Sequence, residues 1–190
     1  MRIVIGVPNT GTLRERTVLS LVGLMRTPGV DVALATQQGA VLHENRWRLV
    51  QMARRVHADF LFFLDADIAC ADTTIARLLA HEKPIVGAAY LARQQDRRES
   101  TVSLLPDGKT PGPIPTEPFE AYAVPLGCTL IALEVFEKVP QPWFAYEYSE
   151  DGNVSVSEDT RFCREARRAG FPVWCDPTIP VGHVGDYVYR

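Results

Sequence analysis

The sequence is short of cysteine, of long apolar runs and of excess positive charge, and each shortage excludes a class of protein. Its 190 residues include four cysteines, and no two of them form a Cys-x-x-Cys pair. This count and spacing argue against a zinc knuckle and against a disulfide scaffold. We expect these residues to be buried as small apolar side chains; they are Cys70, Cys128, Cys163 and Cys175.

Membrane insertion and general nucleic-acid binding are also disfavoured. No apolar stretch reaches the roughly 18 residues that a membrane-spanning helix needs. The 20 Lys and Arg residues are outnumbered by 23 Asp and Glu, which gives a formal net charge of −3. The isoelectric point of about 5.8 is far from that of a nucleic-acid binder. Because the first residues enter an apolar run without a signal-peptide pattern, we expect a cytoplasmic protein with no direct membrane span.

Short apolar runs alternate with segments of helical periodicity in the first half of the chain. Strands are predicted at residues 2–7, 30–36 and 84–90, and helices at 13–26, 41–56 and 72–81. In the first helix, Val18, Leu21 and Val22 are expected to face the core. The continuously apolar run Phe60–Leu64 is typical of a central strand buried on both faces. The pattern predicts a single α/β domain with a Rossmann-like, mostly parallel central sheet and helices on both faces.

The second half is predicted to be less regular. Residues 106–118 contain five prolines and two glycines, so we expect a loop, and one that orders over a bound ligand. A strand at 123–133 contains Gly127, where the missing side chain permits close approach of a ligand. The remaining predicted elements are a helical turn at 134–138, a loop at 141–156, a helix at 160–169, a terminal strand at 171–175 and a tail from 176 to 190.

Two aspartates, Asp65 and Asp67, directly follow the run Phe60–Leu64. Two carboxylates at i and i+2 in extended chain point to the same side, and ligands of open α/β sheets bind at the carboxyl ends of the strands. Such a pair repels itself unless a divalent cation is bound. The alternative is a turn or helix cap before Asp72, because Asp-x-Asp is frequent in acidic loops.

A second acidic site, Ser157-Glu158-Asp159, opens the last predicted helix. One interpretation is purely structural, because Ser157 is a natural N-cap, Ser155 and Glu158 have capping-box spacing, and acids in a first turn complement the helix dipole. The functional interpretation is that one of these carboxylates takes a proton from an acceptor hydroxyl. Both interpretations stand at this stage.

His183 lies between Gly182 and Gly185, near the end of the chain. A lone histidine is most often a surface or core residue. Together with Asp65 and Asp67, however, an imidazole completes a mixed oxygen and nitrogen set that suits manganese better than magnesium or a structural zinc. The sequence therefore predicts that these three side chains converge in the folded protein.

The order of these features resembles the GT-A fold glycosyltransferases, in particular compact family-2-like members. The resemblance covers nearly the whole chain, from the strand that ends in Asp65-Ala66-Asp67 to His183. The segments Arg46-Trp47-Arg48-Leu49-Val50 and Pro84-Ile85-Val86-Gly87-Ala88 are similar in pattern to small bacterial and phage members. At Trp47 the chain departs from that pattern, which has a small polar residue there.

The resemblance implies a role for each of these residues. Asp65, Asp67 and His183 would hold Mn²⁺ or Mg²⁺, Asp159 would be the catalytic base of an inverting reaction, and Glu158 would support it. The residues implied to bind the nucleoside-diphosphate sugar are Pro8, Asn9, Thr10, Arg46, Asp65 and Gly127. Residues 1–105 would form the nucleotide-sugar and metal half of the domain, and 106–190 the acceptor and catalytic half.

Three other functions compete with this interpretation. In a haloacid-dehalogenase-type phosphatase, a hydrophobic strand also ends in Asp-x-Asp, but it is the first strand of the fold. A sugar nucleotidylyltransferase starts with a basic, Gly-rich phosphate loop, which residues 6–11 lack. A non-catalytic domain that only binds a sugar nucleotide is the third. The sequence leaves the sugar, the nucleotide and the acceptor open, and the acceptor classes are a glycan, a lipid-linked glycan, a protein and a modified nucleic acid.

Overall fold

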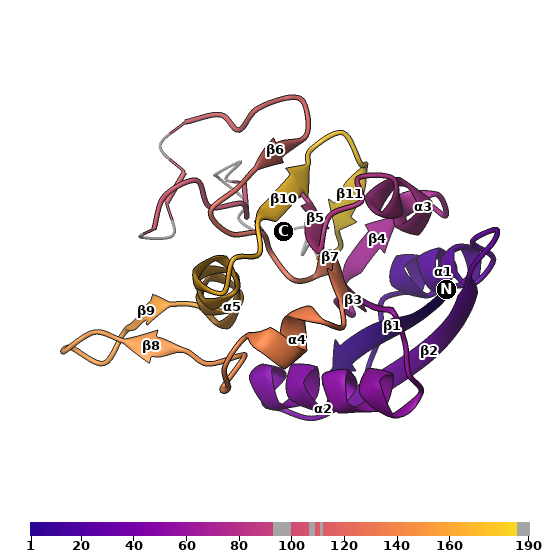
Figure 1. Ribbon diagram of the computed structural model, residues 1–190, viewed down its shortest axis with the longest axis horizontal. Coiled ribbons are helices and arrows are strands. Elements are labelled where there is room, and N and C mark those ends of the chain that lie inside the picture. Colours follow the sequence, from indigo (N-terminus) through magenta and orange to yellow (C-terminus); the bar gives the residue numbers. More distant parts are fainter. Residues whose placement is uncertain (93–99, 107–108, 111, 186–190) are drawn as a thin grey trace, which may run out of the picture.

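A computed structural model describes residues 1–92, 100–106, 109–110 and 112–185 of the chain (Figure 1). Its centre is a seven-stranded sheet. In spatial order the strands are β2 (Asp31–Gln38), β1 (Arg2–Asn9), β3 (Phe60–Leu64), β7 (Cys128–Ala132), β5 (Ile85–Ala88), β10 (Val173–Asp176) and β6 (Phe119–Glu120).

Five of the seven strands run in one direction. β1 is parallel to β2 and β3, and β10 is parallel to β5. β7 lies antiparallel between β3 and β5, which gives β3 and β5 the same direction, and β6 is antiparallel to β10. The mostly parallel sheet is as predicted and is consistent with a GT-A-like fold. The carboxyl ends of β1, β2 and β3 therefore meet at one edge of the sheet.

Helices cover both faces of the sheet (Figure 1), as the sequence predicts. One face packs against α2 (Leu42–Arg55), α4 (Val135–Lys138) and α5 (Glu158–Arg168), and the other against α1 (Glu15–Leu24) and α3 (Thr74–Leu79). β3 supplies both cores, with Leu61 and Phe63 on one side and Phe62 and Leu64 on the other. The prediction of a central strand buried on both faces is confirmed, because all four side chains are fully buried.

The predicted inner face of the first helix is correct at Leu21 and wrong at Val18 and Val22. α1 buries Thr17, Ser20 and Leu21, whereas Val18 and Val22 are exposed. The reason is a close approach between α1 and the segment that follows β3. The Ser20 hydroxyl accepts a hydrogen bond from the backbone N–H of Cys70 at 3.0 Å, and a side chain at Gly23 would lie 2.8 Å from the Cβ of Asp72. Only small residues fit at this contact, so Val18 and Val22 are turned outward, while Leu21 and Leu24 remain in the core.

Two predicted loops contain strands. The segment 141–156 forms a hairpin of β8 (Glu147–Tyr148) and β9 (Val154–Val156). The predicted tail contains β11 (Val181–His183), which pairs antiparallel with β4 (Ile68–Cys70), so the strand at 171–175 is not terminal. Both elements are too short to show the period-2 pattern that identifies strands in a sequence. Residues 186–190 of that tail, and 107, 108 and 111 of the proline-rich segment, lie outside the described residues.

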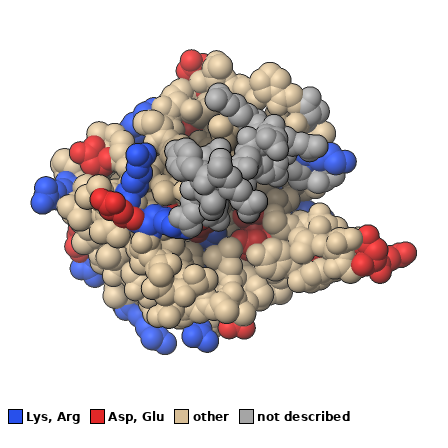
Figure 2. Space-filling view, turned by 180° about the vertical axis from the view of Figure 1, so that it is seen from behind, with Lys and Arg blue, Asp and Glu red and all other residues tan. Residues whose placement is uncertain are grey.

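The composition-based expectations can be compared with the fold. All four cysteines are free; three are buried and Cys70 is half-buried, close to the burial expected from the sequence. Among the described residues no helix is long and apolar enough to cross a membrane. In the view of Figure 2, blue and red side chains are scattered over the surface rather than gathered in one patch of a single sign. On that face, outside the grey atoms, the charges give no broad basic surface for nucleic acid.

Candidate active site

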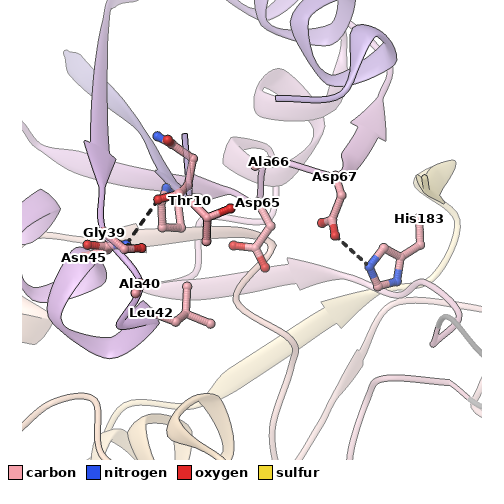
Figure 3. Close-up of a pocket in the computed structure, with 11 residues that line it drawn as sticks. Thr10, Gly39, Ala40, Leu42, Asn45, Asp65, Ala66, Asp67 and His183 are labelled. Atoms are coloured by element: carbon pink, nitrogen blue, oxygen red, sulfur yellow. Dashed lines mark hydrogen bonds and ion pairs between the residues drawn. The ribbon is translucent and has the colours of Figure 1, made fainter. Parts of the chain in front are cut away.

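A cavity of about 450 Å³ lies at the carboxyl ends of β1, β2 and β3 (Figure 3). It is lined by Pro8, Asn9, Thr10, Gly39, Ala40, Leu42, Asn45, Asp65, Ala66, Asp67 and His183. Of the ten site residues predicted from the sequence, six line this one cavity. Its position agrees with the general rule that ligands of open α/β sheets bind where the parallel strands end.

Asp67 and His183 are brought together by the small sheet of β4 and β11. His183 is paired with Ile68 in the strand register, and the N–H of Val184 donates to the carbonyl of Asp67 at 2.7 Å. The two side chains face each other across the cavity, with 3.6 Å between His183 Nε2 and Asp67 Oδ2 (Figure 3). The structure therefore brings the predicted imidazole together with Asp67, whereas the third member of the predicted set, Asp65, is directed at Arg46.

The imidazole of His183 is held in one orientation. Its Nδ1 lies 3.1 Å from the carbonyl oxygen of Leu91, and the ring meets Tyr90 edge-on with 5.4 Å between ring centroids. Because a carbonyl only accepts hydrogen bonds, Nδ1 carries the proton and Nε2 is directed at Asp67. This arrangement, in which one ring nitrogen donates to the backbone and the other is presented to a cavity, is typical of metal-binding histidines.

Asp65 has a different partner. Its carboxylate faces Arg46 of α2, with Nη2 at 3.0 Å from Oδ1 and 3.2 Å from Oδ2, while its backbone N–H donates to the carbonyl of Gly127. Burial raises the pKa of Asp65, Arg46 opposes that shift, and the neighbouring charge of Asp67 adds to it. The repulsion expected within the aspartate pair is thus partly offset by a cation of the protein itself.

Arg46 joins the two acidic motifs. Its side chain is only 2% exposed, lies over the ring of Phe63, and places Nε 3.6 Å from Oε1 of Glu158. We call Arg46, Asp65 and Glu158 the Arg46 cluster. Arg46 is not among the side chains that line the cavity, so the structure puts it behind the predicted donor site, where it contacts carboxylates of the protein.

Glu158 and Asp159 differ in their surroundings. Glu158 is 5% exposed. Burial, and then the charge of Asp159, raise the pKa of Glu158, while Arg46 and the nearby Tyr146 hydroxyl oppose that shift. Asp159 is half-buried, and its Oδ1 accepts hydrogen bonds from the N–H of Thr160 at 2.7 Å and from the Ser157 hydroxyl. Neither acid lines the cavity, but the Asp159 charge is close enough to raise the pKa of Asp65.

The capping interpretation of the helix start is correct only in part. Ser157 occupies the N-cap position of α5, as expected, but its side chain forms no capping hydrogen bond to the backbone. Its hydroxyl bonds Asp159 instead. Because Glu158 is the first residue of the helix rather than the third, the capping box with Ser155 does not form.

The missing side chain at Gly127 leaves room for other side chains of the protein. A Cβ at this position would lie 2.5 Å from the Tyr90 hydroxyl and 2.6 Å from Oδ2 of Asp65. The close approach predicted at Gly127 is therefore made by Asp65 and Tyr90, and Gly127 does not line the cavity. Burial and the Asp65 charge raise the pKa of Tyr90, which keeps its hydroxyl protonated beside that carboxylate.

The side chains around the cavity can be tested for their fit to a metal ion. In the described part of the chain, no group of three His, Cys, Asp or Glu side chains is arranged to hold one; Asp65 is directed at Arg46. Two ligand atoms that each lie about 2.0–2.2 Å from one ion are roughly 3–3.6 Å apart, and Asp67 and His183 match this spacing at 3.6 Å. Mg²⁺-type sites often take only one or two protein ligands and complete the shell with substrate phosphates and water.

Five lining residues were not predicted as site residues from the sequence: Gly39, Ala40, Leu42, Asn45, and Ala66 between the two aspartates. Asn45 is nearly buried and donates from Nδ2 to the carbonyl of Gly39 at 2.8 Å, which shapes the wall opposite Asp67. Helical periodicity places Leu42 in the core, because it carries no information about the open edge of a sheet. The connectivity does carry that information, since the first turn of α2 follows β2 directly and must lie at its carboxyl end.

The sheet topology and the cavity at its carboxyl edge define an α/β protein with a GT-A-like architecture. Comparison with protein-family models and with curated proteins gives no match. The crystal structure of A197 from STIV is similar over 100% of this chain and 97% of that one, with a TM-score of 0.62 and 18% sequence identity. S. aureus TarS 1–349 is similar over 93% of this chain and 60% of that one, with a TM-score of 0.46 and 11% identity. The likeness to A197 shows that the whole chain shares one fold with that protein.

Proposed function

We propose that this protein is a metal-dependent glycosyltransferase, which moves a sugar from a nucleoside-diphosphate sugar to an acceptor hydroxyl. The observation that carries the proposal is the pairing of Asp67 with His183 inside a cavity at the carboxyl edge of a GT-A-like sheet. The same cavity continues to the turn Pro8-Asn9-Thr10 after β1. One end therefore suits the base of a nucleotide and the other its diphosphate.

Asp67 and His183 would hold Mn²⁺ or Mg²⁺ in this site. When bound, the cation offsets the negative charge that gathers on the diphosphate as the bond to the sugar breaks. Arg46, behind the cavity, keeps Asp65 oriented and reduces the repulsion that the carboxylates exert on a diphosphate. Together, the bound cation and Arg46 would allow the site to accept an anionic donor although four carboxylates lie in or near it.

The proton acceptor for the incoming hydroxyl would be Asp159. Glu158 is committed to Arg46 and Tyr146, whereas Asp159 is less buried and is oriented by the Ser157 hydroxyl and the N–H of Thr160. A positioned carboxylate that removes this proton contributes typically 10²- to 10⁴-fold to the rate. With Asp159 on the side of the sugar opposite the diphosphate, the reaction inverts the anomeric centre.

The geometry of Asp65 disfavours a phosphatase of the haloacid-dehalogenase type. There the first aspartate of the motif attacks phosphorus, so its carboxylate has to be free. Here that carboxylate is paired with the buried Arg46, and β3 is the third strand of the chain rather than the first.

The proposal is tested by a screen of nucleoside-diphosphate sugars with manganese. We expect one donor to raise the melting temperature in the presence of the ion but not with chelator, and to release nucleoside diphosphate slowly when water is the acceptor. Stabilisation without any release over the whole screen, in water and with acceptor glycans, would instead identify a non-catalytic binding domain. Equal stabilisation with chelator would remove the metal from the proposal.

A further inference from the structure

A second cavity, of about 370 Å³, lies against the other side of the first turns of α2. Leu42 and Asn45 face the Asp67–His183 cavity. The helix contributes a different set of side chains to the second cavity, because residues at 3.6 per turn separate into opposite faces. This second cavity is lined by His43, Glu44, Trp47, Arg48, Gln141, Pro142, Trp143 and Phe144. We call it the Trp47 cavity.

Trp47 is exposed but fixed. Its side chain is 42% exposed, and the indole Nε1 donates a hydrogen bond to Oε1 of Gln141 at 3.3 Å. The partly exposed ring therefore offers an aromatic surface to the cavity that it lines. Because the hydrogen bond already restrains the ring, little conformational freedom is lost when a ligand stacks on it.

The floor and the rim of the Trp47 cavity differ in polarity. The floor consists of Trp143 and Phe144, which are almost fully buried. At the rim, Glu44 and Arg48 form an exposed ion pair at 3.9 Å, so their charges cancel. The lining thus combines aromatic surface with paired polar groups and has no net charge to attract an anion or a cation.

A neutral sugar ring matches this lining. A pyranose has apolar C–H faces that stack on an aromatic ring and hydroxyl groups around its edge that hydrogen-bond to carboxylate, guanidinium and amide groups. A phosphate group would meet no unpaired cation at this rim, and a purely apolar chain would leave Glu44 and Arg48 without a role. The volume lies within the range of ordinary ligand pockets.

The Trp47 cavity is connected to the proposed base by direct contacts. The ring of His43, on the cavity wall, meets Tyr146 edge-on with 5.7 Å between centroids. The Tyr146 hydroxyl is close enough to Glu158 to lower the pKa of that acid, and Glu158 precedes Asp159 in the chain. Two side chains, His43 and Tyr146, therefore lie between the cavity and Glu158 at the start of α5.

We propose that the Trp47 cavity binds a neutral sugar unit of the acceptor. The acceptor is then a glycan, whatever carrier it is attached to. The naming of this sugar as the acceptor rests on the proposed glycosyltransferase function; the binding of a neutral saccharide does not.

The test is a titration of the intact protein, without nucleotide or metal, with methyl glycosides and disaccharides of glucose, galactose, mannose and N-acetylglucosamine. The readout is the indole N–H resonance of Trp47, which Trp47→Phe assigns among the 3 tryptophans. We expect at least one saccharide to shift this resonance, with a Kd of about 1 mM. Trp47→Ala should weaken its binding about tenfold, measured by saturation transfer to the sugar, and Trp47→Phe much less.

Leu19→Ala is the matched control, because Leu19 is another exposed apolar residue, on α1, and it should leave saccharide binding unchanged. Urea unfolding of each variant shows that it is folded. The proposal is overturned if no saccharide shifts the resonance, if Trp47→Ala binds as well as the parent, or if only an apolar dye binds at Trp47. Manganese-dependent nucleotide binding is measured on the same samples, so that a failure of the donor site is seen separately from a failure of the sugar site.

Discussion

Asp65 and Asp67 stand two residues apart and are exposed to a similar extent, with side chains 24% and 23% accessible, yet they belong to different regions of the molecule. Asp65 is in the Arg46 cluster, where its carboxylate meets a buried guanidinium. Asp67 is outside the cluster and faces His183 across an open cavity. One region pairs its carboxylates with a buried guanidinium, and the other places a carboxylate beside an imidazole in the lining of a cavity.

The second acidic motif is divided in the same way. Glu158 contacts Arg46 and belongs to the cluster, whereas Asp159 stands outside it and is less buried. Each motif therefore supplies one carboxylate to the Arg46 cluster and one that lies outside it. The comparison teaches that adjacent acids in a motif need not share a role, because one buried arginine selects a member from each.

The largest effect is expected from Asp159→Asn. If the acid outside the cluster is the base, this change lowers the rate of transfer by about 10²- to 10⁴-fold and leaves donor binding and the free energy of unfolding nearly unchanged. The measurement is nucleoside-diphosphate release with manganese and an acceptor glycan, alongside donor affinity. A variant with full turnover would remove Asp159 from this role and would point to Glu158.

Arg46→Met tests the cluster itself. It leaves Asp65 and Glu158 buried without their cation, and removal of one partner from a buried ion pair destabilises a protein by about 3–5 kcal/mol. Urea unfolding measures this loss. Arg48→Met, two residues along α2 and in an exposed ion pair, is the control and should change stability by less than about 1 kcal/mol. Equal losses of stability in the two variants would contradict a stabilising role of Arg46 in the cluster.

The stability lost in Arg46→Met should depend on pH. The pKa values of Asp65 and Glu158 are already above their ordinary 3.8 and 4.5, and without Arg46 they rise further. Between the ordinary and the raised values the folded protein binds more protons than the unfolded chain, so stability falls as pH rises through that window. The destabilisation of Arg46→Met should therefore be small below about pH 4 and greatest above the raised pKa values. A loss that does not vary with pH would contradict this.

Asp67→Asn tests the region outside the cluster. Loss of one of two protein ligands should weaken manganese-dependent binding of a nucleoside diphosphate by at least about tenfold, or roughly 1.4 kcal/mol, with little change in the urea midpoint. Calorimetry with and without chelator measures the affinity. Asp72→Asn, an exposed acid a few residues on, serves as the control. Unchanged affinity would show that Asp67 holds no ion.

The smallest effect is expected from Gly127→Ala. The added Cβ would meet Asp65 and Tyr90 at less than 3 Å, so the Asp65 carboxylate has to move away from Arg46. We expect a loss of about 1 kcal/mol in stability, seen as a lower melting temperature. Gly112→Ala, where a Cβ meets no atom within 4 Å, should show no such loss. Equal melting temperatures in both variants would mean that Asp65 tolerates displacement.

Patterns that depend on local chemistry were predictable. The run Phe60–Leu64 identified the central strand because a strand buried on both faces is continuously apolar, and the rule for strand ends then placed Asp65 and Asp67 at the correct edge. Val18 and Val22 of α1 were wrongly predicted to face the core. Helical periodicity assumes a large apolar partner surface, whereas α1 packs closely through Ser20 and Gly23.

The sequence by itself determined the α/β class, the central strand and the set of acidic and imidazole residues, because these follow from short-range patterns of apolar and polar side chains. Only the tertiary structure decided how those residues are grouped. The pairing of β11 with β4 brings His183 to Asp67, and the packing of α2 on the sheet buries Arg46 between Asp65 and Glu158. Such contacts join segments distant in the chain, and their partners are fixed by burial and charge compensation that no local pattern records.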